Sequence, residues 1–514
     1  MIIIYHQDNK VDFAWNSEEK KALRLKSVLA ADALFEAASL FPDSLVVWCD
    51  ASQKENLNLA MLPEIFHHKK IMASYNPGGN YLPDAIGYVD QSPFIKINKQ
   101  VNYPTWQMSG CVGGISSTVL NSLKKEIREV KNFEYFLNSL AKLAMPAGLL
   151  CYSVPNLVVN TNSFCKQEKA SLFVFFKFVK QHYRVRWIFI LFLNYFIYEK
   201  RFLFFPLLTA LFYKNKKNSD AILASIPIES TKKVIEKKTI NVVIPTIGRK
   251  KYLYDVLKDF SVQTHLPDKI IIVEQNPLAE STSELDFICG ENWPFEIKHI
   301  FTHQAGACNA RNLALSETSS EWIFLADDDI RFENNFLEEA FKKIALYSNQ
   351  AYSFNCLKKS DKVIYNQTSQ WHSFGSGCSI IKNTQTTKDI KFNIGLEFGY
   401  GEDSEFGMQL RNKGLDVIYL PYPIITHLSA PIGGFRTKPQ LQWHREDIQP
   451  KPSPTVMLFK ILHFTEKQIK GYKTILFFKY YNKQSVKNPI KYYLKFLKQW
   501  KCSIYWANQL KAKQ

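Results

Sequence analysis

The chain has 514 residues, 46% of them hydrophobic, so it is long enough for roughly two or three domains and too rich in core-forming residues to be a disordered scaffold. Its formal net charge of +18 is concentrated in two aromatic-rich segments. Residues 173–217 carry nine Lys or Arg and one acid, and residues 455–514 carry thirteen Lys and one acid. The rest of the chain is close to neutral, so the basic charge belongs to these segments rather than to the rest of the folded chain.

The nine cysteines are scattered, odd in number and without a CxxC pair. This pattern argues against a zinc knuckle or a disulfide framework and predicts free thiols in a reducing compartment. The first residues, MIIIYHQDNK, contain too short an apolar run for a signal peptide. We therefore expect the folded body to be cytoplasmic.

Residues 1–164 are predicted to form a small α/β domain, with strands at 2–5 and 45–49 and a helix over 18–40. The segment LVVWCDAS at 45–52 has the layout of WIFLADDD at 322–329, and an SGC tripeptide precedes an apolar patch in both halves of the chain. One interpretation is a degenerate copy of the second half that is structural or binds an acceptor. Chance similarity over such short stretches is the alternative.

Residues 165–217 contain two uncharged runs, 187–198 and 202–213, each too short for a helix that crosses a bilayer. Their composition predicts a pair of amphipathic helices lying in the plane of a membrane surface. A buried pair of core helices is the alternative. A polar and charged linker is expected over 218–238.

Residues 239–450 alternate between strand and helix patterns, which predicts a mostly parallel sheet with helices on both faces. The expected strands lie at 239–245, 269–274, 298–302, 322–325, 352–357 and 416–420, and the expected helices include 252–264 and 336–347.

Three carboxylates follow the apolar run that begins at Trp322. A buried strand cannot hold them, so Asp327, Asp328 and Asp329 should emerge at its carboxyl end, where α/β sheets bind ligands. Adjacent acids repel one another unless a cation is near, and Asp327 and Asp329, two residues apart, can face one hard divalent ion. An acidic turn that caps the next helix is the alternative.

Five motifs occur in a fixed order: VVIPT, IIIVE, GACNARN, FLADDD and GYGEDSEFGMQL. Together they resemble glycosyltransferase family 2 over about residues 240–436. The resemblance implies a GT-A fold and an inverting transferase that moves a sugar from a nucleotide diphosphate sugar, with a UDP-sugar the favoured donor. The acceptor would be a hydroxyl of a glycan or lipid-linked molecule, in bacterial cell-surface polysaccharide synthesis.

The resemblance also implies roles for particular residues. Asp327, Asp329 and His427 would bind Mg²⁺ or Mn²⁺, and Asp403 would be the general base, with Glu402 holding the acceptor or orienting the base. The donor would be contacted by Thr246, Glu274, Arg311, Asp328 and Arg436. Simpler readings are a hydrogen-bonded loop histidine for His427, a surface arginine for Arg311, favourable first-turn acids for Glu402 and Asp403, and a plain turn around Arg436.

Residues 451–514 interleave Lys with aromatic residues and are predicted to be a helical tail. The run at 475–481 is too apolar for a nucleic-acid-binding face, so an anionic membrane surface is the expected partner and nucleic acid is not. The expected location is therefore peripheral, on the inner face of the cell membrane. Rival functions are a non-catalytic sugar-nucleotide or glycan-binding protein and a glycoside hydrolase, although a hydrolase gives no reason for a metal site at a strand end.

Overall fold

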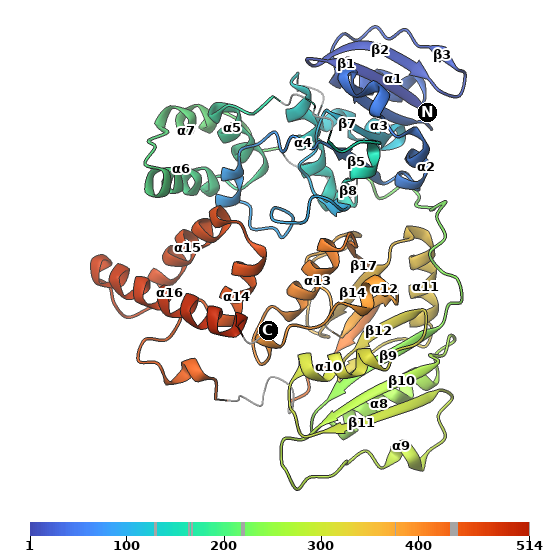
Figure 1. Ribbon diagram of the computed structural model, residues 1–514, viewed down its shortest axis with the longest axis vertical. Helices are drawn as coiled ribbons and strands as arrows, with labels where there is room; N and C mark the ends of the chain where they lie inside the picture. The colour runs from blue at the N-terminus through green and yellow to red at the C-terminus, as the bar shows by residue number, and fades with distance from the viewer. Residues whose placement is uncertain are drawn as a thin grey trace. The chain divides into compact units, whose positions relative to one another are not determined.

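The computed structural model describes residues 1–127, 131–162, 165, 168–216, 222–375, 377–431 and 440–512. The chain forms two compact units, each built around one sheet (Figure 1). Unit 1 comprises Met1–Lys232 and Thr465–Leu476, and unit 2 comprises Lys233–Phe464 and Phe477–Gln514. The boundary between residues 232 and 233 falls inside the predicted linker.

The sheet of unit 1 has the strand order β3-β2-β1-β4-β7-β5-β8-β6. β1 is parallel to β4 and β5 to β8, whereas β7 is antiparallel to both of its neighbours. The strands are β1 (Ile2–Gln7), β2 (Lys10–Asn16), β3 (Lys21–Ala22), β4 (Leu45–Asp50), β5 (Ile71–Tyr75), β6 (Tyr103–Pro104), β7 (Val112–Ser116) and β8 (Leu150–Ser153).

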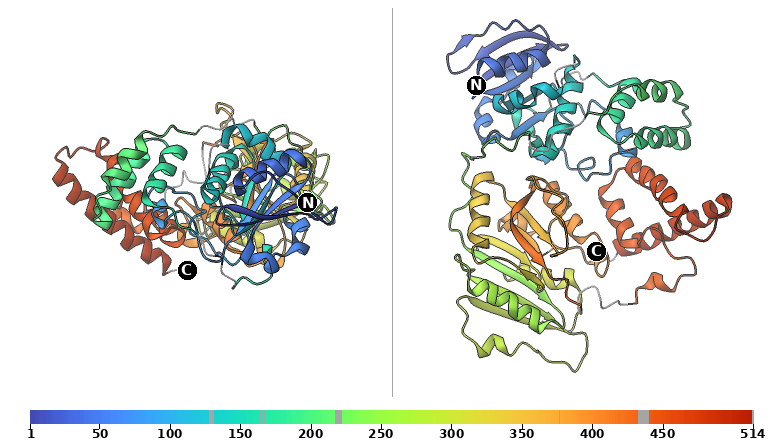
Figure 2. Two further views of the ribbon diagram at one scale, coloured as in Figure 1. Left: turned by 90° about the horizontal axis from the view of Figure 1, so that it is seen from above. Right: turned by 180° about the vertical axis from the view of Figure 1, so that it is seen from behind.

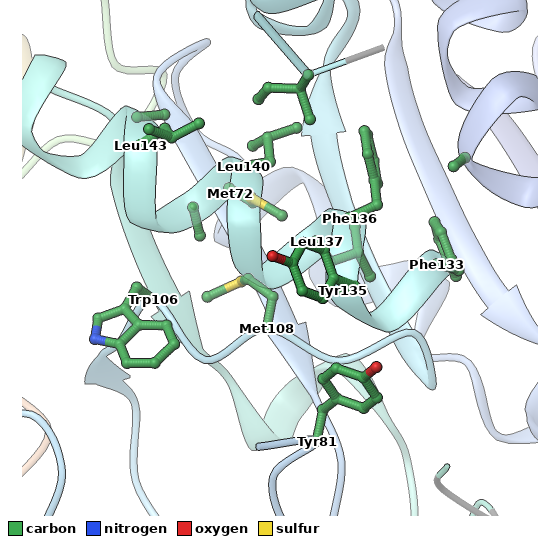
Figure 3. Packing of buried hydrophobic residues seen from close by; sticks show 14 of the residues in the cluster. Met72, Tyr81, Trp106, Met108, Phe133, Tyr135, Phe136, Leu137, Leu140 and Leu143 are labelled. Atoms are coloured by element: carbon green, nitrogen blue, oxygen red, sulfur yellow. The ribbon is translucent and has the colours of Figure 1, made fainter. Parts of the chain in front are cut away.

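Helices α1 (Ala30–Leu40), α2 (Leu62–Ile65), α3 (Ser117–Ile127) and α4 (Phe133–Ala144) accompany this sheet. The helix predicted over 18–40 is shorter than expected, because residues 21–22 form β3 and the helix begins at Ala30. Figure 3 shows Phe133, Phe136 and Leu140 of α4 among the buried residues that form the core of unit 1.

The sheet of unit 2 has the order β11-β10-β9-β12-β16-β14-β17-β13, and β15 pairs with β17. The first four strands are parallel, β14 is parallel to β17, and β16 is antiparallel to both of its neighbours, so the prediction of a mostly parallel α/β sheet is confirmed. The strands are β9 (Ile240–Thr246), β10 (Lys269–Gln275), β11 (Glu296–Thr302), β12 (Trp322–Ala326), β13 (Ile330–Arg331), β14 (Ala351–Leu357), β15 (Ser369–Gln370), β16 (Cys378–Lys382) and β17 (Val417–His427).

β12 lies between β9 and β16, and all five of its residues are buried, as expected for a strand covered on both faces. The helices of unit 2 that precede β17 in the chain are α8 (Lys250–Ser261), α9 (Phe287–Gly290), α10 (Ala307–Ser316), α11 (Phe336–Tyr347), α12 (Gln385–Lys388) and α13 (Glu402–Asn412). The predicted helices at 252–264 and 336–347 correspond to α8 and α11.

The two sheets share a strand order. A parallel pair (β1 and β4, or β9 and β12) is followed by an antiparallel strand (β7 or β16), a second parallel pair (β5 and β8, or β14 and β17) and a short antiparallel strand (β6 or β13). Asp50 follows β4 residue Cys49, which pairs with β7, just as Asp327 follows β12 residue Ala326, which pairs with β16. This order favours a degenerate copy over chance similarity. Beside β1, however, stand the antiparallel β2 and β3, where β9 has the parallel β10 and β11.

Helices α5 (Leu172–His182), α6 (Arg186–Glu199) and α7 (Phe204–Leu211) belong to unit 1. Their inner faces, including Phe176, Ile188, Leu191 and Leu207, join the core cluster of the unit 1 sheet. The inner side of the segment predicted to lie in a membrane plane is therefore packed in a protein core, as the alternative reading expected for the helix pair, while large apolar side chains such as Phe202 and Phe212 remain exposed on its outer side. Figure 2 shows these green helices grouped beside the unit 1 sheet.

The predicted tail over 451–514 is instead part of the folded body, which corrects the expected domain boundary. Within unit 2, α14 (Pro454–His463) packs on α16 (Pro489–Lys511), whose Tyr492, Phe496 and Trp500 are buried. The segment Thr465–Leu476, which contains most of α15 (Glu466–Tyr481), belongs to unit 1. Aromatic spacing of three to four residues places these rings on one helix face. None of the described helices is both long enough and apolar enough to cross a bilayer.

Asp90 joins three parts of unit 1 through one buried carboxylate. Its Oδ2 atom accepts hydrogen bonds from Trp106 Nε1 at 3.0 Å and Tyr183 Oη at 2.7 Å, and lies 2.9 Å from Lys142 Nζ. Burial acts to raise the pKa of Asp90, but Lys142, Tyr183 and Ser92 outweigh it and hold that pKa below its usual range. The carboxylate thereby ties the end of α5 to α4.

We expect Asp90→Asn to lower the free energy of unfolding by about 3 kcal/mol at neutral pH, because the partly buried Lys142 loses its buried counter-charge. The native pKa lies below the ordinary value of 3.8, so this stabilisation is present above that value and is lost as pH falls below it. Urea unfolding should show the difference between wild type and variant narrowing below about pH 4. Asp84→Asn, at an exposed acid nearby, is the control; a difference independent of pH would contradict this account.

Candidate functional site

A cavity of about 750 Å³ opens in unit 2 at the carboxyl ends of β9, β10 and β12. This is the edge at which parallel α/β sheets bind ligands. The cavity brings together several residues predicted from sequence, namely Thr246, Arg311, Asp327, Asp328, Asp329 and His427. Its wall also includes Arg249, Gln275, Gly306, Lys358, Glu397, Phe398, Tyr400, Trp443 and His444.

The three aspartates emerge beyond β12, as predicted, but they are not equivalent. The side chain of Asp327 is 27% exposed, whereas those of Asp328 and Asp329 are 4% and 3% exposed. Asp327 packs so closely on Gly377 that a Cβ atom there would lie 2.2 Å from its Cγ. The glycine of the second SGC tripeptide is therefore needed to leave room for the most accessible carboxylate.

Asp328 is held by two residues that follow β9. Thr246 Oγ1 donates to its Oδ2 at 2.7 Å, and Arg249 Nη1 lies 2.7 Å from its Oδ1. Burial raises the pKa of Asp328 to about 6, against the opposing effect of Arg249 and Thr246. Asp328, predicted to contact the donor, does line the cavity, and its carboxylate is at the same time bonded to Thr246 and Arg249.

Arg249 is a site residue that the sequence analysis missed. Its Nη1 atom also lies 3.4 Å from Asp329 Oδ2, so one guanidinium compensates two buried acids. The sequence feature that could have identified it is its position in the turn after β9, because β9 is parallel to β12 and three acids follow β12. Gly248, with φ of +60°, forms that turn.

Asp329 pairs with His427 at the end of β17, with Nε2 3.2 Å from Oδ1, and its Oδ2 accepts the Ala430 N–H at 2.9 Å. The hydrogen bond to Asp329 raises the pKa of His427. Burial acts to raise the pKa of Asp329, but His427, Ala430 and Arg249 outweigh it and lower that pKa. His427 is thus a hydrogen-bonded histidine at the end of β17, and its protonated form would add a positive charge to the acidic edge.

Asp327, Asp329 and His427 have the chemistry of ligands for Mg²⁺ or Mn²⁺, and all three line the same cavity. Among the described residues, however, no three His, Cys, Asp or Glu side chains are arranged to hold a metal. Asp327 is directed to Arg311 and Asp329 to His427. The donor set fits a divalent cation, which would have to compete with Arg311 for Asp327.

Arg311 connects the aspartates with the acidic pair that follows. It projects from α10, is buried, and places Nη2 3.1 Å from Asp327 Oδ1. Burial acts to lower the pKa of Arg311, but the charges of Asp327, Asp403 and Glu402 outweigh it and raise that pKa. Arg311 is therefore not an ordinary surface arginine.

Glu402 and Asp403 begin α13, directly after Gly401, whose φ is +114°. Both side chains are partly buried, and burial raises the pKa of Glu402. The described residues that line the cavity do not include either acid. The pair is close enough to Arg311 to raise its pKa. Both acids lie in the first turn of α13, as the simpler reading expected, and their role in catalysis stays a prediction.

The cavity wall departs from prediction at β10. Gln275, rather than Glu274, lines the cavity, and its Oε1 accepts the Gly306 N–H at 2.6 Å. Glu274 instead accepts the Glu284 N–H and lies 2.9 Å from His299 Nε2. The described residues that line the cavity do not include Glu274, whose carboxylate fixes the loop after β10, so its contact with the donor stays a prediction.

Glu397 is a second missed residue. Its carboxylate accepts the N–H groups of Cys308 at 3.0 Å and Asn309 at 2.9 Å, at the start of α10. Gly306, with φ of +147°, leaves space for this carboxylate. Burial raises the pKa of Glu397. Arg436, predicted to contact the donor, lies outside the described residues.

We expect Arg249→Met to lower the free energy of unfolding by about 3 kcal/mol, because Asp328 and Asp329 lose a buried counter-charge. The native pKa of Asp328 is already above its ordinary value, and without Arg249 it should rise further. The difference in unfolding free energy between wild type and variant should therefore be small near pH 5, where Asp328 can be protonated, and should increase toward about pH 8. Urea unfolding at both values measures it.

Lys358→Met is the matched control, because Lys358 lines the same cavity but its side chain is exposed. A deficit of equal size in both variants, or one unchanged by pH, would contradict the assignment to Arg249.

Comparison with known proteins identifies a shared segment. Residues 241–404 match the sequence profile described as Glycosyl transferase family 2. The chain is 27% identical over 162 residues to a protein of Streptococcus pneumoniae serotype 4 named glycosyltransferase GlyA, covering 30% of this chain and 22% of that protein. It is 28% identical over 111 residues to an uncharacterized glycosyltransferase, RC0461, of Rickettsia conorii, covering 22% and 18% respectively. The chain thus spans about a fifth of the length of these relatives.

Solved structures of S. aureus TarS are also similar. The TarS 1-349 structure in complex with UDP-GlcNAc has 16% identity and a TM-score of 0.34, covering 46% of this chain and 70% of that one. A further TarS crystal structure has 18% identity and a TM-score of 0.32, covering 38% and 37%.

Proposed function

Residues 241–404 belong to glycosyl transferase family 2, and from this premise we propose that the protein transfers a sugar from a nucleotide diphosphate sugar to a hydroxyl group. The proposed acceptor is a glycan or lipid-linked molecule used in cell-surface polysaccharide synthesis, and the proposed donor is a UDP-sugar. The observation that carries the proposal is the cavity in which three aspartates, two arginines and His427 meet at the carboxyl edge of the sheet.

The charges at this edge suit a diphosphate. Arg249 and Arg311 are both held beside the cavity by carboxylates, and Lys358 lies exposed on its wall. Guanidinium and ammonium groups are the usual partners of phosphate oxygens. Thr246 and Gln275, at the ends of β9 and β10, are the polar groups that we propose contact the nucleoside.

In the proposed reaction the acceptor oxygen attacks the anomeric carbon, its bond to the carbon forms as the bond to the diphosphate breaks, and the acceptor proton passes to Asp403. Asp403 is suited to this role because it lies in the first turn of α13. Arg311 is close enough to both Asp403 and Asp327 for each carboxylate to raise its pKa. Glu402, whose pKa is raised by burial, would orient the acceptor or the base.

A divalent cation is proposed at Asp327, Asp329 and His427. When bound, it would neutralise the negative charge of the departing diphosphate. Arg311 would remain beside the site as a second positive charge, because the charges of Asp403 and Glu402 also favour its protonated form.

A non-catalytic sugar-nucleotide or glycan-binding protein is the second candidate. The observation in its favour is that Glu402 and Asp403 are not among the described lining residues of the cavity. The two candidates differ in turnover: a binding protein would retain a nucleotide sugar without hydrolysing it.

We expect Asp403→Asn to reduce kcat by roughly 10²- to 10⁴-fold, because the acceptor proton loses its base. Donor affinity should change by no more than about twofold, since Asp403 stands outside the cavity wall. Transfer kinetics together with calorimetric titration of the donor measure both quantities. Asp361→Asn, an exposed acid of the same unit, is the control, and full activity in Asp403→Asn would remove this residue from the role.

Incubation with a panel of nucleotide sugars, scored for slow hydrolysis with and without Mn²⁺, tests the proposed activity. We expect Mn²⁺ to strengthen UDP binding in the wild type by about tenfold or more, and by much less in Asp327→Asn and Asp329→Asn. Binding of UDP that is equally tight without metal would contradict the proposed cation, and absence of hydrolysis with every donor would favour the binding protein.

A further inference from the structure

Unit 1 exposes a dense apolar surface on α6, α7 and the residues that flank α7. We name it the α6–α7 face, and its side chains are between 40% and 83% exposed. It consists of Phe189, Phe196, Ile197, Phe202, Phe204, Phe205, Leu208, Leu211, Phe212 and Tyr213. The two helices lie side by side in Figures 1 and 2. Clustered exposure of so many large apolar side chains marks an interaction surface rather than ordinary protein exterior.

The α6–α7 face is ordered before any partner arrives. The opposite sides of the same helices, with Ile188, Leu191 and Leu207, are fixed in the core of unit 1. On the exposed side, the ring of Phe202 lies 5.3 Å from that of Phe192 and 6.2 Å from that of Phe204, measured between centroids. Docking would therefore cost little conformational entropy.

Basic residues surround this face. Arg184, Arg186, Lys200, Arg201 and Lys214 are all exposed. The only acid of the sequence between residues 172 and 216 is Glu199, whose carboxylate lies 3.2 Å from Lys467 Nζ. An apolar surface with a cationic rim complements the anionic headgroups and acyl chains of a bilayer surface.

We propose that the α6–α7 face docks the protein on the surface of an anionic lipid bilayer. Phe202, Phe205 and Phe212, the most exposed members, enter the headgroup region, and Lys200, Arg201 and Lys214 meet lipid phosphates. The C-terminal helices, expected from composition to be the anchor, are less suitable because the aromatic stripe of α16 is buried in unit 2.

The test is flotation of the full chain with vesicles of phosphatidylcholine, with and without phosphatidylglycerol. We expect wild-type protein to float with the anionic vesicles. The triple variant Phe202→Ser, Phe205→Ser, Phe212→Ser should bind at least about tenfold more weakly, because three apolar groups are lost from the interface. The variant Lys200→Gln, Arg201→Gln, Lys214→Gln should lose the preference for phosphatidylglycerol and the sensitivity to salt.

Ile364→Ser is the matched control, because Ile364 is 78% exposed on unit 2, outside this face. It should bind vesicles like the wild type. All variants should keep the circular dichroism spectrum and donor hydrolysis of the wild type, so failure of docking is distinguishable from failure of the proposed activity.

Three results would overturn the inference. Vesicle binding could be unchanged in the phenylalanine variant, or it could be lost instead in Tyr493→Ser with Leu494→Ser, two exposed residues of α16. The third result would be that analytical ultracentrifugation detects a dimer formed through the α6–α7 face, while the protein does not bind anionic vesicles.

Discussion

The main constraint on unit 2 is that three adjacent carboxylates at the end of a buried strand must be neutralised. β12 is buried between β9 and β16, so Asp327–Asp329 must stand at one edge of the sheet. Like charges so close together in a partly buried setting are costly unless each finds a cation. Arg249, Arg311 and His427 come from three different elements, and each supplies that charge. Neutralising the acids therefore also fixes the turn after β9, helix α10 and the end of β17 around one cavity.

The same arrangement explains how a site can be stable when empty and still bind an anion. The arginines are oriented by protein carboxylates, so little reorganisation is needed before they meet phosphate oxygens. Asp327 differs from its neighbours because its side chain is the most exposed of the three and is bonded to the guanidinium of Arg311. It is the carboxylate that can exchange partners at lowest cost, which is the property that the proposed cation requires. Asp328 and Asp329 serve instead as the fixed part of the edge.

The sequence was most informative where the pattern is local. The apolar run ending in three acids located β12 and the cavity edge, and the order of motifs located α10 and α13 around it. Arg249 could not be assigned from its own neighbours, because its role depends on a parallel strand about eighty residues away in the chain. Glu274 and Gln275 are adjacent and both polar, and only the loops after β10 decide which one faces the cavity. Composition misled the interpretation of residues 451–514, since the spacing of the buried rings matters more than the number of lysines.

The shared strand order of the two units shows what happens when the acidic edge is reduced to one residue. Asp50 follows Cys49 as Asp327 follows Ala326, and its Oδ1 atom accepts the N–H of Ser52 at 3.0 Å and its hydroxyl at 2.6 Å. A single carboxylate that is hydrogen-bonded to a neighbouring residue does not need positively charged side chains from other elements. At the adjacent strand end, His6 Nε2 lies 2.7 Å from a backbone oxygen, that of Gly110. The same strand order can therefore support a different kind of surface. In unit 1 that surface is the outer side of α6 and α7, whose inner side is continuous with the core of the sheet. One strand order thus occurs in two units, of which one has a charged cavity beyond its acidic strand end and the other an exposed apolar face on α6 and α7.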